Sequence, residues 1–194
     1  MDLRIELNIE CIEQCENLSD EVYLTAGITE RGIPAVRARS LWEGRMSCDD
    51  AGRCQSGPFL LWQGQVPDGH VVAVLLNLIE QDGLSYAPGV ELADRMARRA
   101  SGLLAQKGEE AASELHRIDY ATLLDHECGP AGCLASDQLV GSFIFVLHNR
   151  VGGGLDVKIH PILHASMGTD GRLEFSGGGK YRGAVTVNGK RLGG

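Results

Sequence analysis

Residues 71–79, VVAVLLNLI, form the most apolar stretch of the chain and decide its predicted fold. The stretch lies between PDGH at 67–70 and EQDG at 80–83, whose Pro, Gly and Asp residues are typical of turns. A short apolar run that is bounded by turns and rich in branched aliphatic residues predicts a strand covered on both faces. We therefore expect residues 71–79 to form a central strand of a sheet.

Other strands are predicted on both sides of this one. Residues 1–10 and 21–28 alternate apolar and polar side chains, which is the period of a strand with one buried face. The segment between Ser47 and Pro58, SCDDAGRCQSGP, has the composition of a loop. After the middle of the chain, strands are predicted at 139–149, 154–165, 172–176 and 181–189, with glycine-rich turns between them.

Residues 88–126 follow a different pattern, which predicts a pair of helices. Over 89–106 the apolar residues recur at helical spacing, with Glu91 four residues before Arg95 and Asp94 four before Arg98. A second helix is predicted at 109–125, after Gly108. Strands on both sides of this insertion predict a mainly β protein: one antiparallel β-sandwich domain over residues 1–194, with a helical pair inserted at 88–126.

Composition and charge narrow the classes of partner. The chain has 194 residues and a net charge of −8, and its one cluster of arginines, at 95–99, fits the polar face of a helix. Nucleic acid is therefore not expected as a partner. No window has the roughly 18 apolar residues of a membrane span. The first ten residues resemble a strand and not a signal peptide, so we expect a cytoplasmic protein as the sequence is written.

The six cysteines leave a second, oxidising compartment open. They form three local pairs, whose short spacing suggests disulfides within loops and an oxidising environment, but buried thiols are an equally good explanation. Zinc is disfavoured because none of the pairs has C-x-x-C spacing. The pairs are Cys11 with Cys15, Cys48 with Cys54, and Cys128 with Cys133.

Acidic residues stand at the predicted ends of three strands. They are Asp20 and Glu21, Glu80 and Asp82, and Asp137. Ca²⁺ takes about six to eight oxygen ligands in a flexible cage, and loops at one end of a sandwich can supply them from distant parts of the chain. A shared cation would also explain why acids crowd together there, while the plain alternative is a set of solvated turns.

These three segments resemble the calcium-binding loops of C2 domains. SDEVYL at 19–24 is similar to the family's S-D-P-Y-V segment, with Glu21 where the family usually has Pro. LNLIEQD at 76–82 resembles V-x-D-x-D, and SDQLVGSFIFVL at 136–147 matches D-D-x-I-G-x-x-x-x-x-L. The resemblance implies a C2-like sandwich that binds Ca²⁺ through Asp20, Glu80, Asp82 and Asp137. Glu21, next to Asp20 in the acidic cluster, is a fifth candidate ligand. It also implies a non-catalytic targeting role, with an anionic lipid or a protein as partner.

Two other functions remain open from the sequence. One is a hydrolase that pairs Cys128 with His160 or His164 as nucleophile and base. The other is a secreted interaction or toxin-like protein whose loops are held by disulfides.

Overall fold

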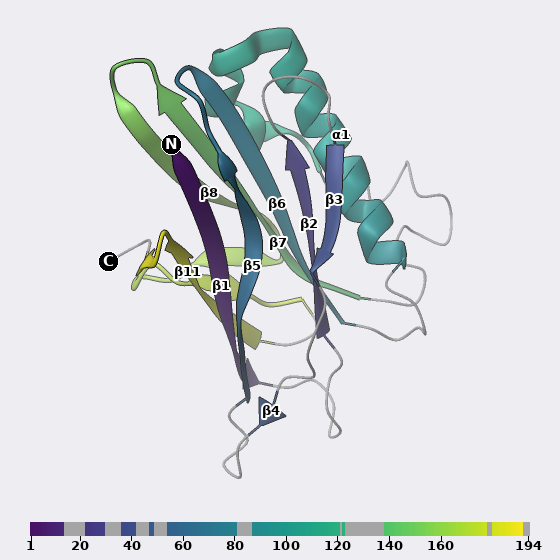
Figure 1. The fold of residues 1–194 in the computed structure, drawn as a ribbon. Helices are drawn as coiled ribbons and strands as arrows, with labels where there is room; N and C mark the ends of the chain where they lie inside the picture. Colours follow the sequence, from purple (N-terminus) through teal and green to yellow (C-terminus); the bar gives the residue numbers. More distant parts are fainter. Residues whose placement is uncertain are drawn as a thin grey trace.

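Two antiparallel β-sheets and one α-helix make up the fold among the residues that the computed structural model describes (Figure 1). The structure describes residues 1–13, 22–29, 36–41, 47–48, 54–80, 87–120, 122, 138–177 and 180–191. Strands precede and follow the helical segment, so the predicted mainly β class is confirmed.

The seven-stranded sheet has the order β4-β5-β1-β11-β10-β9 in the described part of the chain, with β12 paired to β11. Its strands are β1 (Asp2–Glu13), β4 (Ser47–Cys48), β5 (Cys54–Gln65), β9 (Ala165–Met167), β10 (Leu173–Phe175), β11 (Lys180–Val187) and β12 (Lys190–Arg191). The five-stranded sheet has the order β3-β2-β6-β7-β8. Its strands are β2 (Val22–Thr29), β3 (Val36–Leu41), β6 (His70–Glu80), β7 (Gln138–Arg150) and β8 (Gly154–Leu163).

The apolar stretch VVAVLLNLI belongs to the middle strand, β6, and its residues 71–79 are all buried. Val72, Val74 and Leu76 belong to the core between the two sheets. Ala73 and Leu75 point the other way, into a second core beneath the helix. Because both faces of β6 are covered, the strand shows no polar alternation, and the prediction of a doubly covered strand is confirmed.

The first core joins the two sheets. The apolar side chains of β1 that alternate along residues 3–9 pack against the inner faces of β2, β6 and β7. Phe143 from β7 meets Phe175 from β10 edge to face, with ring centroids 5.1 Å apart. Such aromatic pairs add to the stabilisation from apolar burial, so this contact helps to hold the sheets together.

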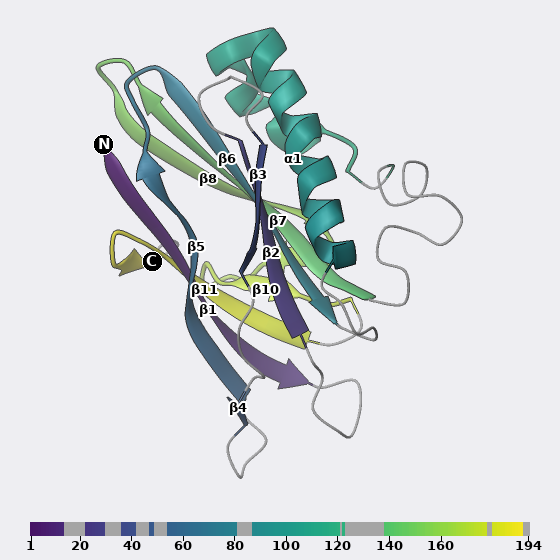
Figure 2. The same ribbon diagram turned by 45° about the vertical axis from the view of Figure 1, so that its right-hand side comes forward.

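Helix α1 (Ala87–Lys107) lies against the other face of the five-stranded sheet (Figure 2). The predicted first helix is therefore confirmed, and both predicted ion pairs form on its outer face. Arg95 Nη2 lies 2.6 Å from Glu91 Oε1, and Arg98 Nε lies 2.7 Å from Asp94 Oδ2. Among the described residues, no helix has the length and apolar character needed to cross a membrane.

The helix approaches β2 closely at two glycines. A Cβ at Gly27 would lie 2.3 Å from the Ala93 carbonyl oxygen and 2.9 Å from Ala97 Cβ. A Cβ at Gly89 would lie 2.5 Å from the Tyr23 ring. Because real Cβ contacts are not this short, α1 can reach this position only where glycine leaves the space.

A row of buried polar side chains crosses the same face of the sheet. Thr25, Asn77 and Ser142 are register partners on β2, β6 and β7, and each is 0 % exposed. Ser142 Oγ donates to Asn77 Oδ1 at 2.6 Å, and Asn77 Nδ2 donates to Thr25 Oγ1 at 3.2 Å. The hydrogen bonds compensate for the removal of these groups from water.

The second helix predicted at 109–125 is wrong over residues 109–117. This part of the chain forms two short 3₁₀ helices, η1 (Gly108–Ser113) and η2 (Leu115–Arg117), while Thr122 is helical. Gly108 has φ +55°, a left-handed conformation that ends an α-helix. Ala111, Leu115 and Tyr120 are nevertheless buried in the core beneath α1, so their apolar spacing reflects packing and not a continuous helix.

The loop expected between Ser47 and Pro58 is also partly wrong. Ser47 and Cys48 form β4, and Cys54 to Pro58 belong to β5, whose next neighbour is β1. The polar composition of this segment reflects its place at one edge of the sheet, where local sequence gives little strand signal.

Candidate functional site

Glu80 is the one predicted calcium ligand that the structure describes. It is the last residue of β6 and is partly buried. Asp20, Glu21, Asp82 and Asp137 lie outside the described residues. The geometry that bears on the site is therefore that of the strand ends next to these positions.

Three of these strand ends are neighbours in the five-stranded sheet. Glu80 is the register partner of Val22, the first residue of β2, and of Gln138, the first residue of β7. Glu21 directly precedes Val22 and Asp137 directly precedes Gln138 in the sequence. All three acidic segments therefore adjoin the same end of the five-stranded sheet.

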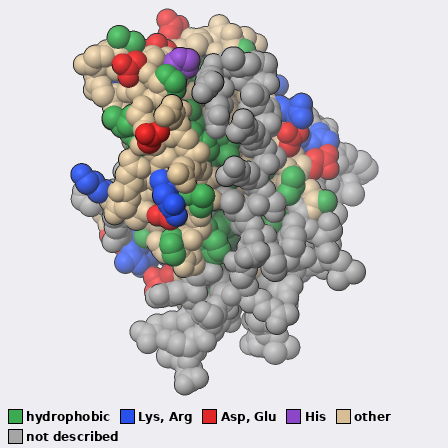
Figure 3. Space-filling view, in the orientation of Figure 1, with side chains coloured by type: hydrophobic (Ala, Val, Ile, Leu, Met, Phe, Trp, Pro, Cys, Tyr) green, Lys and Arg blue, Asp and Glu red, His purple; other side chains and the backbone are tan. Residues whose placement is uncertain are grey.

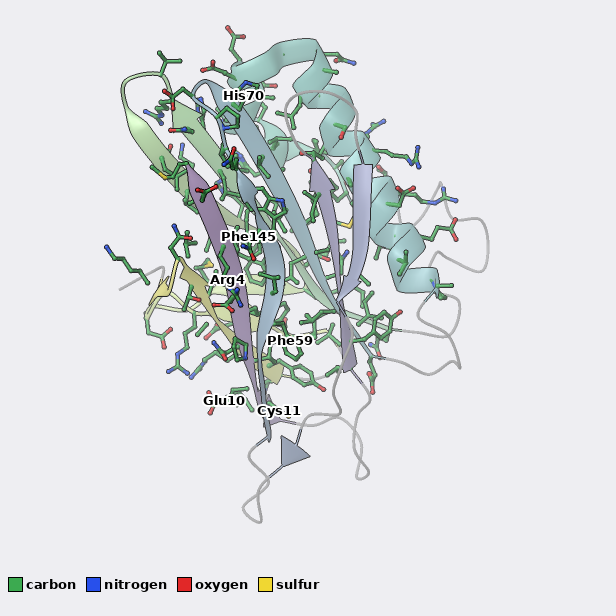
Figure 4. All side chains as sticks on the ribbon, viewed as in Figure 1. Arg4, Glu10, Cys11, Phe59, His70 and Phe145 are labelled. Carbon is green, nitrogen blue, oxygen red and sulfur yellow. The ribbon has the colours of Figure 1, made fainter. Side chains whose placement is uncertain are left out.

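This end is opposite to the turn that precedes β6. The strand runs from His70, labelled in Figure 4, to Glu80, and His70 pairs with Asn149 at the far end of β7. Within the described ranges, no group of three or more His, Cys, Asp or Glu side chains could hold a metal ion. A complete calcium site would therefore need the acidic residues outside those ranges.

A polar pocket of about 280 Å³ opens on the outer face of the seven-stranded sheet. Arg172 and Arg182 line it, but each is paired with carboxylates. Arg172 Nη1 lies 3.1 Å from Glu10 Oε2, and Arg182 Nη2 lies 3.5 Å from Glu174 Oε1. Because acids already balance these arginines, the pocket does not favour an anionic ligand.

The arginines of α1 are balanced in the same way. Blue and red side chains lie beside one another over α1 in Figure 3, in agreement with the ion pairs of Arg95 and Arg98. The interpretation of these residues as the polar face of a helix is confirmed.

Two histidines that are distant in sequence stack on each other. His116 in η2 and His160 in β8 have ring centroids 4.2 Å apart and an interplanar angle of 16°. His116 Nδ1 and His160 Nε2 are buried and have no hydrogen-bond partner among the described residues. The sequence gives no signal for this pair, because no local pattern links residues in separate elements.

The stack bears on the hydrolase alternative. His160 faces His116, while His164 lies between β8 and β9 with φ 48°. Cys128, the proposed nucleophile, lies outside the described residues. The described part of the chain therefore does not contain the proposed nucleophile of this alternative.

Acid is expected to destabilise the protein through His160. Burial, and then the charges of His116 and Lys158, lower the pKa of His160 below its ordinary value of 6.5. The unfolded chain then binds a proton at a higher pH than the folded protein does. We expect the free energy of unfolding to decrease as the pH falls from 6.5 through the folded pKa.

Urea unfolding between pH 8 and pH 5 measures this loss in the wild type and in His160→Gln. At pH 8 the histidine is neutral in both the folded and the unfolded state, so the difference in free energy of unfolding between the two proteins reports packing alone. The further decrease in free energy of unfolding between pH 8 and pH 5 should be smaller in the variant than in the wild type. Equal losses in the two proteins would show that other groups cause the acid sensitivity.

Comparison with protein-family models, curated proteins and solved structures gives no match for this chain.

Proposed function

We propose that the chain is a calcium-binding, non-catalytic module with a C2-like sandwich. Its ligands would be Asp20, Glu21, Glu80, Asp82 and Asp137. One observation carries the proposal: the ends of β2, β6 and β7 that adjoin these residues are register partners. Carboxylates on three adjacent strand ends suit a hard cation that prefers oxygen.

The place of α1 agrees with such a module. The helix belongs to the connection between β6 and β7, which begins and ends beside the acidic residues. It packs on the outer face of the sheet through Leu92, Met96 and Leu104. The first turn of α1 therefore lies close to these strand ends, where Gly89 approaches Tyr23 and Ile79, and the rest of the helix is held against the sheet.

The bound ion would have two roles. It would offset the repulsion among carboxylates at one end of the sheet, and it would present positive charge to an anionic partner. A lipid headgroup or a protein carboxylate could complete its coordination. The protein would then attach to its partner when calcium is present.

Calcium should raise the melting temperature. A ligand at about 100 times its dissociation constant stabilises the folded state by about 2.7 kcal/mol. For a chain of this size, that corresponds to an increase of roughly 5–11 °C. Differential scanning fluorimetry in millimolar Ca²⁺, with and without a chelator, measures the shift, and Mg²⁺ at the same ionic strength controls for screening.

Two matched variants localise the effect. Glu80→Gln removes one predicted ligand and should reduce the calcium shift by about half or more, since affinity follows ligand charge. Glu110→Gln changes an exposed glutamate in η1, beside the His70 end of the sheet, and should keep the full shift. Equal melting temperatures in Ca²⁺ and in chelator would exclude the proposed function.

A further inference from the structure

Asn188 and Gly189 form the turn between β11 and β12, and they are the one Asn-Gly pair in the sequence. Their φ angles are 48° and 75°, and two successive left-handed residues are typical of a type I′ hairpin turn, which favours Asn followed by Gly. Both residues are exposed, and a Cβ at Gly189 would meet no atom within 4 Å. The turn is therefore open to water.

Asn188 extends the pairing between β11 and β1. The register of these strands starts at Ile5 with Val187, and the next residue of the hairpin continues it through both its backbone and its side chain. Asn188 N donates to the Arg4 carbonyl oxygen at 2.8 Å, and Asn188 Oδ1 accepts from Arg4 N at 2.8 Å. Asn188 Nδ2 donates to the Asp2 carbonyl oxygen at 3.1 Å. These three hydrogen bonds, the Asn188 bridge, tie the hairpin to the beginning of β1, near Arg4 in Figure 4.

The Asn-Gly pair also has a characteristic chemistry. The backbone nitrogen of Gly189 can attack Asn188 Cγ, since glycine has no side chain to hinder the approach. The bond from Gly189 N to Cγ forms, the bond from Cγ to Nδ2 breaks, and ammonia leaves with the proton of the glycine nitrogen. Water then opens the succinimide ring at either carbonyl and gives aspartate or isoaspartate. The sum is amide plus water to acid plus ammonia, with no oxidation or reduction.

We propose that Asn188 is a deamidation site whose modification releases the β11–β12 hairpin from the beginning of β1. Aspartate has no Nδ2 donor, so a carboxylate oxygen would face the Asp2 carbonyl oxygen where a hydrogen bond now forms. Isoaspartate lengthens the backbone by one methylene and displaces the N–H that now donates to Arg4. Both products therefore break the Asn188 bridge.

The same bridge restrains the reaction in the folded protein. Asn188 Oδ1 and Nδ2 are both bound to β1, so the side chain is not free to turn Cγ toward Gly189 N or to release Nδ2. The reaction then proceeds from the fraction of molecules in which the hairpin has opened locally. Folding slows the modification, and the modification weakens the contact that slows it. Neither step involves the acidic residues of the proposed calcium site.

Peptide mapping tests the reaction. The full chain is incubated in mildly alkaline buffer, native or in guanidinium, and is then digested briefly with trypsin. Cleavage after Arg182 and Lys190 releases the peptide 183–190, in which mass spectrometry resolves the amide from the acid forms. We expect conversion in both samples, several times slower in the native protein. A synthetic 183–190 peptide in the two buffers corrects for any effect of guanidinium itself.

Asn8 is the internal control for this experiment. It is exposed on β1 but is followed by Ile9, whose branched side chain hinders the attacking nitrogen, so it should remain an amide in both samples. The proposal is overturned if Asn188 is not converted in guanidinium, or if its corrected rates in the native and unfolded protein are equal.

Hydrogen exchange measured by NMR tests the release of the hairpin. In Asn188→Asp, the backbone amide of residue 188 should exchange about tenfold faster than in the wild type, since a hydrogen bond is lost and two acceptors face each other. Asn188→Gly keeps the left-handed turn and removes the side chain without adding charge, so its exchange rate should be intermediate. The β11 amides opposite Leu7 and Ile9 should keep their wild-type rates. Wild-type exchange at residue 188 of Asn188→Asp, or faster exchange along the whole of β11, would contradict a local release.

Discussion

Gly27→Ala is expected to lower the free energy of unfolding by about 3 kcal/mol, at the upper end of the usual cost of overpacking. The added Cβ would lie 2.3 Å from the Ala93 carbonyl oxygen, a backbone atom that cannot rotate away. Either α1 must move off β2 or the sheet must distort, and both disturb the core beneath the helix. Thermal unfolding should show a decrease in Tm of roughly 6–12 °C.

Gly102→Ala is the matched control on the helix itself. Gly102 is exposed on α1, and a Cβ there would have no atom within 4 Å. Alanine is favoured over glycine within a helix, so this variant should gain about 0.5–1 kcal/mol. If Gly27→Ala unfolds at the same temperature as the wild type, that result would contradict the close approach of α1 to β2 at this position.

Asn77→Ala should cost about 2–4 kcal/mol, because it removes the centre of the buried polar row and leaves a cavity. Asn77 is fully buried and links Ser142 on one side to Thr25 on the other. Without its amide, both hydroxyl groups lose a partner in a place that water does not reach. Urea unfolding measures the loss.

Two comparisons separate hydrogen bonding from burial. Asn8→Ala removes an exposed amide from β1 and should change stability by about 0.5 kcal/mol or less. Replacing the whole row, as Thr25→Val, Asn77→Leu and Ser142→Ala, removes the groups that were left unsatisfied and should recover part of the loss. A loss that persists in the triple variant would assign the cost of Asn77→Ala to packing alone.

Local patterns were sufficient to predict the elements with one strong period. Alternation identified β1 and β2, continuous apolar residues identified β6, and helical spacing with two ion pairs identified α1. The prediction of a second helix was wrong over 109–117 for two reasons. Gly108 ends α1, and the short 3₁₀ helices that follow bury apolar residues at a spacing similar to that of an α-helix. Pattern alone does not distinguish packing in such turns from a helix.

Long-range pairing was not predictable in the same way. β1 pairs with β11 from the far end of the chain and with β5, and no local signal indicates either partner. The stack of His116 on His160 likewise joins elements that are distant in the sequence. The candidate calcium site was predictable in part. The sequence indicated the acidic strand ends, but only the register of Glu80 with Val22 and Gln138 shows that these strand ends are neighbours.

The outer strands of both sheets affect association between copies of the chain. β4 has two residues and β9 has three, so the described ends of the seven-stranded sheet offer few backbone groups to an incoming strand. β8 is longer, but Asp156 and Lys158 place charge along it, and Pro161 removes a backbone donor. At β4, β8 and β9 these features disfavour edge-to-edge pairing, and with it aggregation through strands added at these three edges.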